Sequence, residues 1–143
     1  MAEVFEKPQE SSTEAEVVEL SIPARAGLLS LPPMTVAAIA ADADFDIEEI
    51  EDLRLAIEEL CLSVVPNGGI GRIALRYSYN SGMLYVECAY EQIEASQERQ
   101  RGDAVAEFSE RLLDALVDEH GRETLPGGPR AWLRKARATS PNG

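Results

Sequence analysis

Two polar side chains in the segment D-L-R-L-A-I-E-E-L-C-L-S could act together in catalysis. Glu59 and Ser63 are four residues apart, so on a helix they lie one turn apart, away from the main apolar stripe. A carboxylate can serve as a general base when its surroundings adjust its pKa. The surrounding segment favours a plainer interpretation, because it is rich in acidic residues and would form a solvated helix face. On composition alone, Glu59 and Ser63 are ordinary helix residues.

The remaining reactive side chains form no recognisable constellation. Cys61 and Cys88 lie in apolar segments and lack the close spacing of a metal-binding or redox pair, so we expect reduced, buried thiols. The single histidine, His120, is expected at a helix end, where it would interact favourably with the helix dipole. Trp132 is expected to pack in the core or at an interface.

The chain carries a large negative charge. Its 143 residues include 13 basic and 26 acidic side chains, and the resulting charge of −13 would repel nucleic acid and attract a basic protein surface. The same charge would also serve solubility. The N-terminus lacks the basic and apolar regions of a signal peptide, and no apolar run is long enough to span a bilayer. We therefore expect a cytoplasmic protein with no direct nucleic-acid or membrane partner.

The order of the expected elements indicates an α+β domain. Alternating and β-branched runs between turn residues indicate strands, and three-four apolar spacing indicates helices. The expected elements are a strand at 16–22, helices at 34–43 and 46–64, a hairpin of 71–79 and 83–90, a surface loop at 92–103, a helix at 105–119 and a hairpin of 123–125 and 131–136. This order places helices on one face of a mixed, largely antiparallel sheet. We assign 16–137 to the domain, 1–15 to a disordered acidic N-terminal tail and 138–143 to a C-terminal tail.

Local signals define the ends of two helices. Asp46 is a good N-cap, and Glu48 and Glu49 suit the positive end of the dipole of the second helix. Gly121 is expected to end the last helix. The residues of that helix expected to point inward are Phe108, Leu112, Leu113, Leu116 and Val117.

Two segments resemble the RsbW-type anti-sigma factors of the histidine-kinase-like (GHKL, Bergerat-fold) ATPase superfamily. They are D-L-R-L-A-I-E-E-L-C at 52–61 and L-L-D-A-L-V-D-E at 112–119, and the resemblance extends over roughly 16–137. It implies a two-layer α+β sandwich that binds a sigma factor. It also implies control by a small antagonist with a STAS domain, which many members phosphorylate on serine using ATP. Related anti-sigma factors are often dimers, so the resemblance also suggests a homodimer.

The resemblance assigns roles to particular positions. Glu59 takes the place of the family's general base, and Ser63 takes the place of its Mg²⁺-binding Asn. A serine hydroxyl can ligate Mg²⁺ but has a shorter reach. At 86–90 the family's adenine-binding D-x-G-x-G is V-E-C-A-Y, with Cys88 in a vestigial cofactor position and no glycine. At 107–109 the phosphate-binding G-x-G turn is E-F-S.

These three changes in one pocket predict weak or absent ATP binding. The sequence therefore predicts a degenerate GHKL protein that needs no cofactor. It would sequester a sigma factor and be released by a STAS-domain antagonist through partner exchange. The main alternative is an active serine protein kinase using ATP and magnesium, with Glu59 as base and Ser63 as metal ligand. A third hypothesis is an adaptor that binds only the antagonist.

Overall fold

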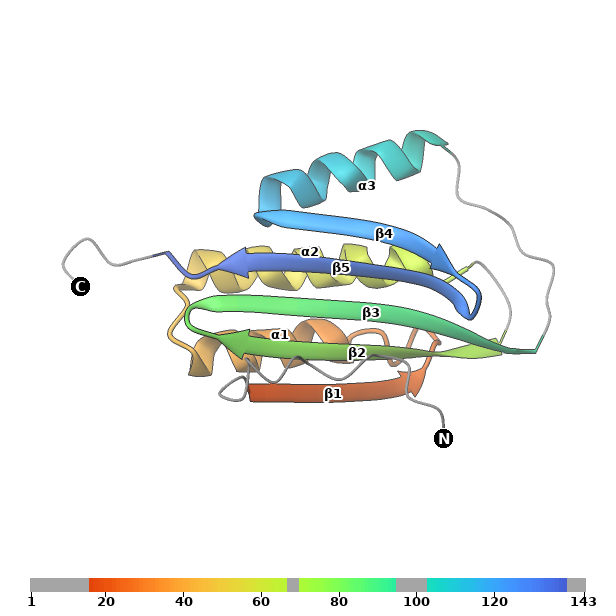
Figure 1. Ribbon diagram of the computed structural model, residues 1–143, viewed down its shortest axis with the longest axis horizontal. Coiled ribbons are helices and arrows are strands. Elements are labelled where there is room, and N and C mark those ends of the chain that lie inside the picture. The colour runs from red at the N-terminus through yellow and green to blue at the C-terminus, as the bar shows by residue number, and fades with distance from the viewer. Residues whose placement is uncertain (1–15, 67–69, 95–102, 139–143) are drawn as a thin grey trace.

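The computed structural model describes residues 16–66, 70–94 and 103–138. The strands form one sheet in the order β1-β2-β3-β5-β4, and helices α1 and α2 lie behind it in Figure 1. The elements are β1 (Glu16–Pro23), α1 (Leu31–Asp42), α2 (Ile47–Val64), β2 (Ile70–Asn80), β3 (Met83–Glu94), α3 (Asp103–Leu116), β4 (Glu119–Leu125) and β5 (Gly128–Ala136). The α+β class is confirmed, and every described strand pairing is antiparallel. The expected N-terminal tail, 1–15, lies outside the described residues. So does the expected C-terminal tail, 138–143, apart from Ala138.

The core lies between the sheet and helices α1 and α2. Alternate residues of each strand point toward the helices, as the period of two in a strand requires. Helix α2 buries one stripe against them, as its three-four spacing predicts. The largest fully buried side chains of these elements are Pro32, Val36, Leu53, Ile57, Leu60, Val64, Ile73, Leu75, Tyr77, Leu84, Val86 and Leu133.

The start of α2 is fixed by reciprocal hydrogen bonds. The Glu49 backbone N–H donates to Asp46 Oδ1 at 2.7 Å, and the Asp46 backbone N–H donates to Glu49 Oε1 at 2.9 Å. Such a capping box satisfies two backbone donors that the first turn of a helix leaves unpaired. The predicted N-cap is therefore confirmed.

The region around α3 and β4 differs from the prediction. Helix α3 ends at Leu116 and β4 begins at Glu119, so Gly121 lies inside a strand and does not end a helix. A Cβ added at Gly121 would lie 2.7 Å from the Trp132 ring, because the indole occupies the space above the glycine. His120 consequently lies in β4, with its Nε2 2.6 Å from Asp114 Oδ1 on α3. The expected helix-end position of His120 is wrong.

Two further expectations are also wrong. Phe108 is 60% exposed, because the inward face of α3 is centred on Ser109 and Leu113. Residues 92–94, expected to begin a surface loop, continue β3, since Gln92 pairs with Gly71 of β2. The rest of that expected loop, apart from Asp103 in α3, lies outside the described residues. Within the described chain, no helix is long and apolar enough to cross a membrane.

Candidate functional site

Glu59 and Ser109 are brought together by the packing of α3 on α2. Glu59 is partly exposed in the C-terminal half of α2, whereas the Ser109 side chain on α3 is buried. The Ser109 hydroxyl donates a hydrogen bond to Glu59 Oε1. A hydrogen bond to an ionised acceptor is stronger than one between neutral groups. The carboxylate that would act as a base in an active kinase therefore joins the two helices.

Ser63 is engaged with its own helix. Its Oγ donates to the carbonyl oxygen of Leu60 at 2.6 Å, three residues earlier in α2. A serine hydroxyl has one proton to donate, and here a backbone carbonyl accepts it. The side chain is partly buried in this position. In this rotamer the hydroxyl turns back along α2 instead of extending from it.

Cys88 belongs to the core. The residue has no exposed surface, and its Sγ lies 4.0 Å from Cys61 Sγ. Burial raises the pKa of the Cys88 thiol well above its usual value, with the neighbouring Cys61 contributing in the same direction. Both cysteines are free thiols, as expected. A nucleotide could not reach Cys88 unless the layers separated.

Tyr90 fills the end of β3, where the resemblance places the D-x-G-x-G motif. Only 5% of Tyr90 is exposed, and its ring lies against Gly71 of β2. A Cβ added at Gly71 would lie 2.3 Å from the Tyr90 hydroxyl oxygen. The aromatic side chain therefore occupies space on the helix-covered face that small residues would leave open.

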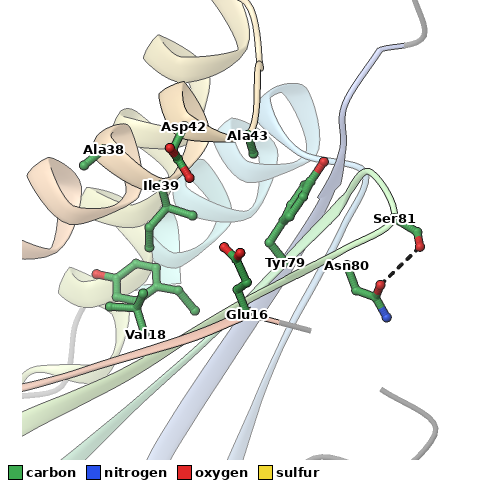
Figure 2. A pocket seen from close by; sticks show the side chains of 10 residues that line it. Glu16, Val18, Ala38, Ile39, Asp42, Ala43, Tyr79, Asn80 and Ser81 are labelled. Atoms are coloured by element: carbon green, nitrogen blue, oxygen red, sulfur yellow. Dashed lines mark hydrogen bonds between the residues drawn. The ribbon is translucent and has the colours of Figure 1, made fainter. Parts of the chain in front are cut away.

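A cavity of about 520 Å³ lies elsewhere, between the edge strand β1, the end of α1 and the β2–β3 turn (Figure 2). Glu59, Ser63, Cys88 and Ser109 do not line it. Sequence reasoning missed this cavity, because the residues around it come from three separated segments and share no motif. In the described part of the chain, no cluster of three His, Cys, Asp or Glu residues is arranged to hold a metal ion.

The face of the sheet away from the helices carries a second group that the sequence did not predict. The Tyr85 and Trp132 rings stack with centroids 6.1 Å apart, and the Arg134 guanidinium carbon lies 5.8 Å and 6.0 Å from them. Trp132 is only partly buried here, so it lies on the sheet surface and not in the core. Arg130 forms ion pairs of 2.9 Å with both Glu87 and Glu123. On this face, the charges of Arg130, Glu87 and Glu123 therefore partly neutralise one another.

The fold and the α2–α3 contact define a one-sided α+β sandwich compatible with the GHKL architecture. Over 77 residues the chain is 30% identical to the serine-protein kinase RsbW of Bacillus thuringiensis (strain Al Hakam), of Bacillus cereus (strain AH187) and of Bacillus anthracis. The match covers 52% of this chain, and the chain spans about half the length, 48%, of these curated relatives. No known family profile matches the sequence. The similarity thus supports a relationship to the RsbW proteins.

Proposed function

We propose that this chain is an RsbW-type anti-sigma factor that acts in the cytoplasm by binding partners, without nucleotide. It would hold a sigma factor away from RNA polymerase and release it when a STAS-domain antagonist competes for the same protein. The observation that carries the proposal is the hydrogen bond from Ser109 to Glu59. In a kinase, these two positions would be the general base and part of the phosphate-binding turn; here they bind each other.

The residues packed around Glu59 support the same proposal. To admit a nucleotide beside Glu59, α3 would have to move and expose Leu113, which is now buried. Exposing an aliphatic side chain of this size costs about 2 kcal/mol. The exposed carboxylate of Glu107 would then lie in the segment that should receive phosphates, where a negative charge is unfavourable. Tyr90 would further obstruct the adenine position.

Thermal unfolding with and without ATP and Mg²⁺ tests the loss of nucleotide binding. A ligand present at a hundred times its dissociation constant adds roughly 2.7 kcal/mol to the native state. For a domain of this size that corresponds to a Tm increase of roughly 8 °C. We expect no measurable increase for this chain, with Bacillus cereus RsbW as a comparison protein. A saturable increase, followed by phosphate transfer to a STAS protein, would establish the kinase hypothesis instead.

Affinity purification from the native host tests the partners. We expect mass spectrometry to identify a sigma factor and, in separate complexes, a STAS-domain protein. Adding the purified STAS protein should release the sigma factor without ATP. Recovery of the STAS protein alone would support the adaptor hypothesis. Size-exclusion chromatography with light scattering would show whether the chain forms the homodimer that the resemblance suggests.

A further inference from the structure

The cavity beside β1 combines an apolar floor with an acidic rim. Figure 2 shows the carboxylates of Glu16 and Asp42 turned toward the same space, with Ile39 between them and the Tyr79 ring to one side. No basic residue lines the cavity. Its lining residues are Glu16, Val18, Ala38, Ile39, Asp42, Ala43, Tyr77, Tyr79, Asn80 and Ser81.

The local backbone adds to the negative potential of the cavity. Asp42 is the last residue of α1, and the last turn of this helix contains no basic side chain. The C-terminal end of a helix carries a partial negative charge, so Asp42 and the helix end reinforce each other. The Arg137 guanidinium partly offsets this by donating to the Ala43 carbonyl oxygen at 2.8 Å. A cation with an aliphatic stem would match both the rim and the floor.

The strand beside the cavity has a free edge. Among the described residues, β1 pairs with β2 alone, so its other edge presents backbone donors and acceptors that can bind an extended chain. Alternate side chains of an added strand would point to the helix side of the sheet. Val18 lies on that side and is nevertheless 40% exposed, which leaves apolar surface for such a side chain to cover.

We propose that β1 binds an extended segment of a basic partner protein and that an Arg or Lys side chain of this segment enters the cavity between Glu16 and Asp42. Charge argues against two other occupants. Residues 1–15 contain four glutamates and one lysine, Lys7, so most of that segment would be repelled. A second copy of β1 would bring two glutamates and no basic residue.

A short peptide tests this site without knowledge of the natural partner. We would titrate the ¹⁵N-labelled full chain with acetyl-Thr-Val-Arg-Val-Thr-amide and with the same peptide carrying citrulline, a neutral analogue of arginine. We expect saturable amide shifts at 16–18 and 38–43, and binding of the arginine peptide roughly fivefold tighter, the upper end of the range for one exposed ion pair. Equal affinity for both peptides, or no saturable shifts at these residues, would overturn the proposal.

Variants distinguish the contribution of the cavity to peptide binding from that of the overall negative charge of the protein. The double variant Glu16→Gln/Asp42→Asn should weaken binding of the arginine peptide at least fivefold, and Ala38→Phe should weaken it by filling the cavity. The control Glu58→Gln/Glu110→Gln removes the same charge from exposed positions on α2 and α3 and should bind as the wild type does. An equal loss in this control would contradict the proposal.

Two further measurements would show whether the N-terminal segment of the chain or a second copy of the protein occupies this site instead. If Lys7 of the chain itself fills the cavity, Lys7→Gln should shift the amides at 16–18 and 38–43 before any peptide is added. If a second copy covers β1, these amides should shift on dilution. Either result would contradict the assignment to a basic partner. The test does not depend on the sigma-factor proposal, which could fail while the peptide still binds.

Discussion

At the residue scale, Glu59 makes a structural contact between two helices. Its carboxylate accepts a hydrogen bond from the buried Ser109 hydroxyl, which ties α2 to α3. A glycine at position 109 could not make this contact, because it has no side chain. The serine therefore does more than replace a glycine of the G-x-G turn. Its hydroxyl stabilises the packing of α3 on α2.

Replacing Ser109 with alanine should destabilise the protein by about 1–2 kcal/mol, because a hydrogen bond to a charged and partly buried group is lost. Urea unfolding followed by circular dichroism would measure the change. Ser63→Ala is a matched control, since the Ser63 hydroxyl bonds only to a carbonyl of its own helix in the contact described. Alanine also has the higher helix propensity, so this variant should be neutral or slightly more stable. Equal losses in the two variants would argue against the proposed link between the helices.

Buried ionisable groups make alkaline pH destabilising. Burial raises the pKa of Tyr77, whose hydroxyl donates to the Pro32 carbonyl oxygen at 3.0 Å, and it also raises the pKa of Cys88. The unfolded chain then releases these protons first. The contribution of these two groups to stability is therefore constant below about pH 8.5 and falls above it, first for the thiol and from about pH 10 for the tyrosine. Each group contributes up to about 1.4 kcal/mol per pH unit. Urea unfolding between pH 7 and 11 should show this decrease in the free energy of unfolding. The variant Tyr77→Phe should show a smaller decrease above about pH 10. The same decrease in the variant and the wild type would be inconsistent with a buried, protonated Tyr77.

At the element scale, the sequence predicts those parts of the fold that depend on local signals. The Asp46 capping box and the apolar stripe of α2 follow directly from residue types and spacing. The α3–β4 junction does not, because its outcome depends on β5. Gly121 is a common helix terminator, yet Trp132 of the neighbouring strand covers it and draws the segment into the sheet. Pairing of β4 with β5 therefore determines whether Gly121 ends a helix or lies within a strand.

Glycine substitutions test how strongly cross-strand contacts fix the sheet. Gly71→Ala should cost about 2–3 kcal/mol, because the new Cβ would lie 2.5 Å from the Glu91 carbonyl oxygen as well as against the Tyr90 ring. Gly121→Ala should cost less, since the nearest atoms to its Cβ belong to the surface side chain of Trp132 and not to the backbone. Gly27→Ala serves as the control, because a Cβ there would meet nothing within 4 Å. Thermal unfolding should rank the three variants in this order, and a harmless Gly71→Ala would refute the described packing of Tyr90.

At the scale of the whole molecule, negative charge is distributed unevenly. On the open face of the sheet, Arg130 pairs with two glutamates and Arg134 lies 3.4 Å from Glu119, so positive and negative groups alternate. The β1 cavity and the exposed surface of α2 have fewer basic residues. The overall charge of −13 could be predicted from the sequence, but its location could not. The cavity in particular depends on how distant segments meet.

This distribution predicts that the proposed complex with a sigma factor is sensitive to salt. Attraction between an acidic surface and a basic partner mainly raises the association rate, and salt screens it over a distance of about 8 Å at physiological ionic strength. Raising NaCl from 50 to 500 mM should therefore slow association about tenfold or more in biolayer interferometry with the purified sigma factor and no nucleotide. Dissociation should change less, because it depends more on close contacts in the complex. The same association rate at both salt concentrations would show that the acidic surface does not steer this partner, even if the two proteins bind tightly.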